Sequence, residues 1–368
     1  MRRALPIFLA LLATLLAGCG EDGEDSTRVR GDTLTIYASL PAHGLDASAG
    51  DDAAVGMRHA LADAGRRAGG RSIRFVRMSS TRPGDRTWDP GTVEANADRA
   101  AGDPTTIAYL GELDRGASAV SLPVINREQI LQVSPADALT SLTQTPPGRP
   151  RAGPERYYPG ERETFVRLVP PDLVAARQIV AQLREQGTRR LAIVTGDGIA
   201  DHELEAMVLG LIGTGQPRTI TRVAAPSADD DPERVTELAE ELVEADPQAI
   251  VYAADSEPRA HAALAVLATR LPGTTLIEGP ALASRGPGTD GEAACAHPGV
   301  PAESALSRAA RRRLETIRHQ GGGDLGVEAL LGYDAMRLTL AAIDSAGPDR
   351  LDVVRAAKAL EARYQVCG

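Results

Sequence analysis

The chain has 368 residues, which is enough for two domains with separate hydrophobic cores. Its net charge of −10 argues against the basic face typical of nucleic-acid-binding proteins, so no nucleic-acid partner is expected. Aromatic residues make up only 3% of the chain, which leaves few side chains for a stacking cage around sugars or bases.

The N-terminus has the features of a secretory signal. Arg2 and Arg3 precede an apolar stretch, residues 5–17, that is too short to cross a bilayer as a helix, which needs about 20 apolar residues. The sequence Leu-Ala-Gly-Cys at residues 16–19 resembles the bacterial lipobox, in which cleavage precedes the cysteine and its thiol receives lipid. This predicts a signal peptide over residues 1–18, and an anchor on Cys19 that holds the protein to the outer face of the cell membrane. The alternative is an uncleaved apolar N-terminus with an incidental cysteine.

Residues 19–32 are polar and acidic, and predict a tether with too little apolar content to fold. From residue 33 onward, short apolar runs alternate with segments of helical period. Strands are expected at 33–40, 71–78, 105–111 and 129–135, and helices at 51–70, 89–103 and 116–128. Asp89 and Pro90 are suited to the cap and the first turn of the second helix.

A stretch rich in Pro, Gly and Arg, residues 144–162, predicts a loop or a boundary. The alternation then resumes, with strands expected at 163–169, 189–196, 218–225, 248–255 and 274–280. Helices are expected between them at 171–187, 200–215, 230–247 and 258–273, and after a second Gly/Pro-rich stretch at 303–320, 326–346 and 351–363. This order predicts an α/β protein with two doubly wound parallel-sheet lobes. In such sheets, ligands lie beyond the C-terminal ends of the strands.

Motifs for catalysis and metal binding are missing from this sequence. The six histidines are scattered, and Gly116–Val120 lacks the last glycine of a nucleophile elbow. We therefore expect no enzyme, no cofactor and no metal site. Cys295 and Cys367 remain once Cys19 carries lipid, and outside the cytoplasm they can form a disulfide. The alternative is two buried thiols.

Several segments, in order, resemble the type I periplasmic binding proteins, and most closely their branched-chain amino acid (Leu/Ile/Val) family. Residues 50–65 resemble that family's first helix, with Gly50 and Gly56 at its two glycines. The segments at Asp89–Pro90, at Gly111, at 133–140 and at 165–172 follow in the family's order. Residues 331–347, which contain Gly332-Tyr333-Asp334-Ala335, are the most specific match, and the likeness runs from residue 33 to about residue 363.

The resemblance implies two lobes joined by a hinge, because the family's chain crosses between lobes three times. It implies a first lobe of residues 33–164 plus 282–346 and a second lobe of residues 165–281 plus 347–368. A small polar or amino-acid-like solute would bind between the lobes, and the lobes would close on it by hinge motion. The implied partner is the membrane permease of an ATP-driven (ABC) importer.

The resemblance implies eleven ligand-binding positions, several of which depart from the family's residues. They are Ala49, Gly111, Arg115, Gly116, Ala136, Asp137, Ala138, Ala200, Asp201, Ser256 and Ala281. The family's aromatic and glutamate partners for an ammonium group are replaced by Ser256 and Ala281, which makes leucine or valine a poor candidate ligand.

Arg115 has two interpretations: it clamps an anionic solute, or it points to solvent and pairs with Asp114 or Glu112. Asp137 and Asp201 either select a cation or polyol, or are exposed turn residues. Two functions therefore remain: a solute receptor of an importer, or a lipid-anchored sensor or scaffold of the same fold that has lost or changed its ligand.

Overall fold

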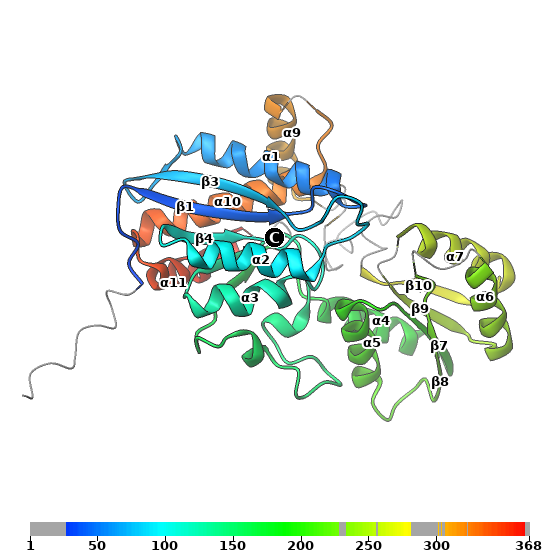
Figure 1. Cartoon of the computed structure of the whole chain (residues 1–368). Coiled ribbons are helices and arrows are strands. Elements are labelled where there is room, and N and C mark those ends of the chain that lie inside the picture. The colour runs from blue at the N-terminus through cyan, green and yellow to red at the C-terminus, as the bar shows by residue number, and fades with distance from the viewer. Residues whose placement is uncertain are drawn as a thin grey trace, which may run out of the picture.

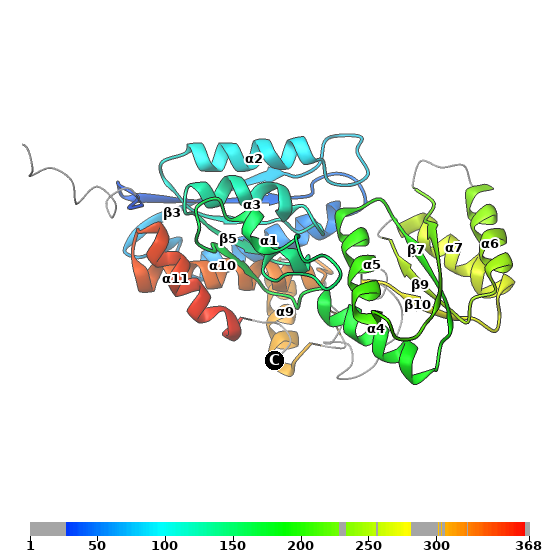
Figure 2. The same ribbon diagram turned by 90° about the horizontal axis from the view of Figure 1, so that it is seen from below.

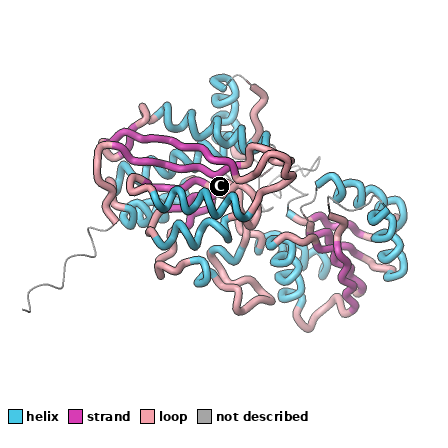
Figure 3. Tube along the Cα trace, in the orientation of Figure 1, coloured by secondary structure: helices cyan, strands magenta, loops and turns pink. Residues whose placement is uncertain are grey.

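The computed structural model describes residues 27–227, 233–254, 257–280, 301, 303, 306–321 and 323–364. They form two α/β lobes, each built on a separate sheet flanked by helices (Figures 1 and 3). The first lobe contains a six-stranded sheet in the order β2-β3-β1-β4-β5-β6, and the second a four-stranded sheet in the order β10-β9-β7-β8. The predicted fold class is confirmed.

The first sheet is parallel except for its short edge strand β2. Its strands are β1 (Thr33–Leu40), β2 (Arg67–Ala68), β3 (Arg71–Ser79), β4 (Thr106–Leu110), β5 (Leu131–Ser134) and β6 (Phe165–Arg167). Every residue of β4 and β5 is buried, as expected for central parallel strands covered on both faces. Strand β2 was not predicted, because its residues follow the first helix directly and end in Gly69 and Gly70.

Helices cover both faces of this sheet. They are α1 (Ala47–Asp63), α2 (Pro90–Gly102), α3 (Ser118–Arg127), α9 (Arg308–Gly321), α10 (Val327–Ala346) and α11 (Arg350–Leu360). Residues of α1, α10 and α11 share one core cluster with the sheet, whereas α2 and α3 contribute to a cluster on its other face. Asp89 caps α2 as predicted, because its Oδ1 accepts a hydrogen bond from Thr92 N at 2.7 Å.

Glycines allow α1 and α10 to approach closely. A Cβ atom on Gly56 would lie 1.8 Å from the carbonyl oxygen of Ala329, and one on Gly332 would lie 2.1 Å from the carbonyl oxygen of Ala53. Any side chain at these positions would therefore overlap backbone. The two glycines belong to segments that are far apart in the sequence, and both were among the residues that carried the family resemblance.

Two segments expected in the second lobe belong to the first, so this part of the predicted boundary is wrong. Strand β6 pairs with β5, with Val133 opposite Val166. Helix α11 buries Val353 and Val354 in the first lobe's core. The physical reason for α11 is connectivity: it starts shortly after α10 ends at Ala346, and Asp349 caps its first turn there.

The second lobe repeats the doubly wound arrangement on a smaller scale. Its strands are β7 (Arg190–Thr195), β8 (Thr219–Ala224), β9 (Ala249–Ala253) and β10 (Thr275–Glu278), all parallel. Its helices are α4 (Leu173–Glu185), α5 (Ile199–Ile212), α6 (Glu233–Ala245) and α7 (Glu257–Arg270). Helices α4 and α5 pack on one face of the sheet and α6 and α7 on the other, each pair with its own apolar cluster.

The Pro/Gly-rich segment 144–162 is mostly loop, as predicted, but it also lies against the second lobe. A Cβ atom on Gly210 of α5 would lie 2.3 Å from the backbone nitrogen of Gly148. Just before this segment, Ser141 N donates to Glu203 Oε1 of α5 at 3.0 Å. Within it, the short 3₁₀ helix η2 (Pro154–Tyr157) buries Tyr157 in a cluster that includes Ala200 of α5. Helix α5 is thus held on the first lobe by polar and apolar contacts.

Candidate functional site

The C-terminal edges of the two sheets meet at one junction (Figure 2). A Cβ atom on Gly116, in the loop after β4, would lie 2.2 Å from Ile199 Cγ2 at the start of α5. Because α5 follows the end of β7, this contact brings the loops at the ends of both parallel sheets together. Gly116 has φ of 82°, and the contact leaves no room for a side chain. In open α/β sheets this edge is where ligands bind.

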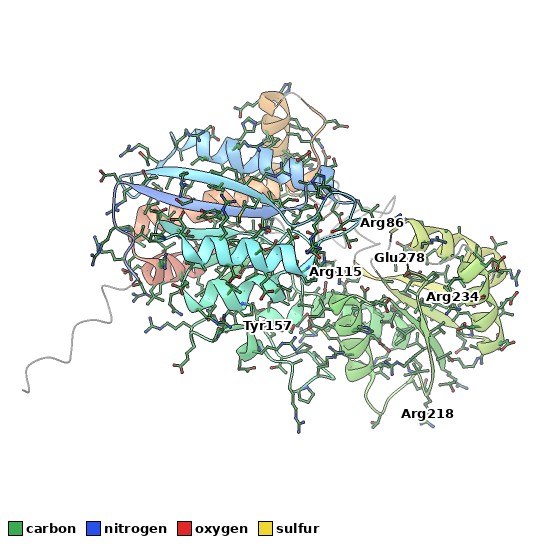
Figure 4. The ribbon with its side chains drawn as sticks, viewed as in Figure 1. Arg86, Arg115, Tyr157, Arg218, Arg234 and Glu278 are labelled. Carbon is green, nitrogen blue, oxygen red and sulfur yellow. The ribbon has the colours of Figure 1, made fainter. Side chains whose placement is uncertain are left out.

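Arg115 lies at this junction and is already paired with an anion (Figure 4). Its Nη2 is 2.6 Å from Asp172 Oδ2, and the two side chains are 12% and 1% exposed. Asp172 immediately precedes α4, and its backbone nitrogen donates to Ala138 O at 2.8 Å. The ion pair therefore joins the β4 loop of the first lobe to the start of the second. The sequence analysis had named Asp114 or Glu112 as partners of Arg115, and the partner seen here is Asp172.

Removing one partner of this pair should be costly, because the other charge stays buried. We expect Arg115→Met to lower the free energy of unfolding by about 3 kcal/mol, measured by urea denaturation. The matched control is Arg355→Met, which breaks the exposed Arg355–Asp352 pair of α11 and should cost less than about 0.5 kcal/mol. Equal losses in the two variants would contradict a structural role for the Arg115–Asp172 pair.

Asp137 is buried and accepts hydrogen bonds from backbone amides, contrary to its interpretation as an exposed turn residue. Its Oδ1 accepts from Gly116 N at 2.9 Å and from Leu139 N at 3.1 Å, and its Oδ2 accepts from Ser118 N at 2.9 Å. These bonds tie the loop after β5 to the first turn of α3. A direct contact between Asp137 and a solute stays a prediction.

Asp201 is also buried, at 3% exposure, in the first turn of α5. Its Oδ2 accepts from Gly198 N at 3.3 Å, so it stabilises the N-terminus of that helix. Ala136 and Ala138 are buried in the first core cluster, and Ala200 contributes to the apolar cluster between the lobes. Ala49 is half-buried on α1.

Gly111 begins the loop after β4. Its φ is 145°, and a Cβ there would lie 2.8 Å from Ser39 O, so the position requires glycine. Ser256, Ala281 and the cysteines Cys19, Cys295 and Cys367 lie outside the described residues. Their predicted roles in ligand binding, lipid attachment and disulfide formation therefore stay predictions.

Two polar groups at this edge, Asp114 and Thr195, were not predicted as site residues. Asp114 is 9% exposed, and its Oδ2 accepts from Ser80 Oγ at 3.2 Å. Burial, with the nearby charges of Asp46 and Asp137 adding to it, raises the pKa of Asp114 to about 7. Thr195 ends β7, and in the described part of the chain its buried Oγ1 has no hydrogen-bond partner. The signal for Asp114 was its place in the loop that follows β4 (Thr106–Leu110).

Arg86 and Glu278 carry opposite charges near the same junction. Arg86 lies on the loop after β3, Glu278 ends β10, and both are exposed (Figure 4). Across the described residues, no group of three or more His, Cys, Asp or Glu side chains is placed to hold a metal ion. None of the helices within the described ranges is both long and apolar enough to cross a membrane.

Comparisons with known proteins agree with this architecture. Residues 33–368 match the family described as "Periplasmic binding protein". A search of curated proteins finds no match. A leucine-binding protein from Thermotoga maritima is similar in structure, with 20% identity and a TM-score of 0.64 over 88% of this chain and 87% of that one.

Two further solved structures are similar over most of their length. One is a solute-binding protein of an ABC transporter from Rhodopseudomonas palustris, in complex with 4-hydroxybenzoate. It has 16% identity and a TM-score of 0.67 over 89% of this chain and 84% of that one. The other is a substrate-binding protein of an ABC transporter from Desulfitobacterium hafniense, in complex with leucine. It has 17% identity and a TM-score of 0.62 over 89% of each chain. At these identities the likeness concerns the fold.

Proposed function

Since the chain belongs to the periplasmic binding protein family, whose members are extracytoplasmic solute-binding proteins and not enzymes, we propose that it is the lipid-anchored receptor of an ABC importer. In this proposal a small polar solute binds where the two sheet edges meet, the lobes close on it by hinge motion, and a membrane permease receives it. Lipid on Cys19 holds the receptor at the outer face of the membrane.

The observation that carries the proposal is the meeting of the loops that follow β4 and β7. Gly116 and Ile199 touch across the junction, and the Arg115–Asp172 pair crosses it beside them. The loops of both lobes are therefore close enough to contact one bound molecule. A solute that contacts both lobes stabilises the closed arrangement by the free energy of the contacts that it makes there alone.

The polar groups at the junction favour a solute with hydrogen-bonding groups. Asp114 lies in the loop after β4 of the first lobe and Thr195 ends β7 of the second, and neither suits an aliphatic side chain. Similar structures hold leucine and 4-hydroxybenzoate. For this chain we keep the prediction of a polar or anionic compound, because the family's ammonium partners are replaced at Ser256 and Ala281.

A thermal-shift screen of the purified protein against metabolite pools tests the proposal. We expect a polar or anionic compound to raise the melting temperature by about 5 °C or more at a hundredfold excess over its Kd. Leucine and valine should leave the melting temperature unchanged. A clear shift with leucine would refute the argument from the missing ammonium partners.

A matched pair of variants tests where the stabilising compound binds. Thr195→Val removes one hydroxyl at nearly constant shape, and we expect it to weaken binding about fivefold or more. The control is Thr219→Val at the exposed start of β8, which should bind as the parent does. If both variants bind the hit equally well, the solute does not contact the end of β7.

A second candidate function follows from the internal bonding of the site. All three charged side chains that were expected to bind a solute interact with other groups of the protein. Arg115 pairs with Asp172, Asp137 accepts hydrogen bonds from backbone amides, and Asp201 accepts one from the N-terminus of its own helix. This favours a lipid-anchored sensor or scaffold that has lost its ligand. The absence of any stabilising compound in the screen would support this alternative.

A further inference from the structure

Most of the segment that connects β5 to β6 lies along one face of α5, a helix of the other lobe. We call residues 139–158 the strap. Ala200, at the start of α5, belongs to an apolar cluster that includes strap residues. Further along the helix, Glu203 Oε1 accepts a hydrogen bond from Ser141 N at 3.0 Å. Near its end, a Cβ atom on Gly210 would lie 2.6 Å from Gly148 Cα. The strap therefore contacts α5 along most of its length, on a single face.

The strap is also fastened to the first lobe. Tyr158 Oη donates to Leu142 O at 2.6 Å, which closes the strap on itself. Arg167 of β6, only 4% exposed, donates from Nη1 to Leu139 O at 2.8 Å, and its Nη2 donates to Thr143 Oγ1. The strap cannot leave the first lobe without breaking these buried hydrogen bonds, each of which would leave a polar group without its partner.

Helix α4 is attached at the same place. Leu173 N, in the first turn of α4, donates to Thr140 Oγ1 of the strap at 2.9 Å, and both residues are buried. Helices α4 and α5 pack together on one face of the second sheet. Figures 1 and 2 both show these two helices closer to the first lobe than α6, which covers the opposite face. The strap thus holds the second lobe by the helix pair on its near side.

We infer that the strap holds the two lobes together before any solute binds, so that the junction of the sheet edges is assembled in the ligand-free chain. Separation of α5 from the strap would expose the shared apolar cluster and would leave the buried Glu203 carboxylate without its amide donor. Hinge motion therefore keeps this contact closed and opens the lobes elsewhere. A solute does not have to bring the lobes together, a requirement that would otherwise weaken its binding.

Gly210→Val in the ligand-free chain tests the inference. The branched side chain would meet the backbone of the strap, so the strap must move off α5. We expect the parent to unfold in one thermal transition, because the apolar cluster belongs to both lobes. The variant should show two transitions by differential scanning calorimetry, the lower at least about 5 °C below that of the parent. Its radius of gyration, measured by small-angle X-ray scattering, should be larger than the parent's.

His202→Val is the matched control, because it places the same residue on the exposed side of α5. It should keep the single transition and the radius of gyration of the parent. If Gly210→Val does not fold, Glu203→Ala decides the question, since it removes the acceptor of Ser141 N without adding bulk. Two resolved transitions would themselves show that each lobe is still folded.

Two transitions in the parent would overturn the inference, and so would a single transition with an unchanged radius in Gly210→Val. Equal changes in His202→Val would overturn it as well. The proposed function fails in a different way: a thermal-shift screen without any stabilising compound would refute the solute receptor and would leave these measurements on the ligand-free chain unchanged.

Discussion

Replacing Gly56 by alanine is expected to lower the free energy of unfolding by about 3–4 kcal/mol and the melting temperature of the first lobe by about 10 °C. The added Cβ would lie 1.8 Å from the carbonyl oxygen of Ala329. This steric overlap can be removed only if α10 moves away from α1, because the atom in the way belongs to the backbone and not to a flexible side chain. That movement would open the core that these helices share with the first sheet. Urea and thermal denaturation, followed by circular dichroism, measure the loss.

Gly102→Ala is the matched control for this substitution. Gly102 is the exposed last residue of α2, and a Cβ there has no atom within 4 Å. Alanine should leave stability unchanged or raise it by up to about 1 kcal/mol, because it has the higher helix propensity. A loss below about 1 kcal/mol for Gly56→Ala would contradict the close helix contact.

Glu112→Gln is expected to remove part of the dependence of stability on pH. Glu112 is fully buried, and its Oε1 accepts a hydrogen bond from Tyr109 Oη at 2.7 Å. Burial raises the pKa of Glu112 from 4.5 to about 8. Between these pH values the folded protein holds a proton that the unfolded chain has lost, so stability falls as pH rises. For one group with this shift, the total loss is about 5 kcal/mol.

Glutamine keeps the acceptor for Tyr109 and cannot ionise. The variant should therefore match the parent at pH 5 and exceed its free energy of unfolding by several kcal/mol at pH 9. Asp114, whose pKa is raised to about 7, contributes a decline that should persist in the variant up to that pH. Urea denaturation at intervals from pH 5 to 9 gives the profile. The control is Glu94→Gln on the exposed side of α2. If the stability of Glu112→Gln fell with pH in parallel with that of the parent, Glu112 would not be the group that holds the proton.

The candidate site was only partly visible in the sequence. The position of the β4 loop followed from the strand order, and it is in this loop that Gly111, Arg115 and Gly116 lie, whereas their contact with a solute stays a prediction. The partner of Arg115 did not follow, because Asp172 is distant along the chain and only its place before a helix marked it. Thr195 gave no signal at all, since a threonine at the end of a β-rich run is ordinary.

The order of strands and helices, and therefore the class of fold, was determined by the sequence alone. Alternation of apolar residues, caps such as Asp89 and helix-ending glycines act over a few residues, so they can be recognised without knowing the partner elements. The lobe to which β6 and α11 belong was decided by the tertiary structure. Phe165–Arg167 has the same local pattern whichever sheet it joins, and its place depends on pairing with β5. The ionic partners of the site, likewise, depend on which distant segments the two packed lobes bring together.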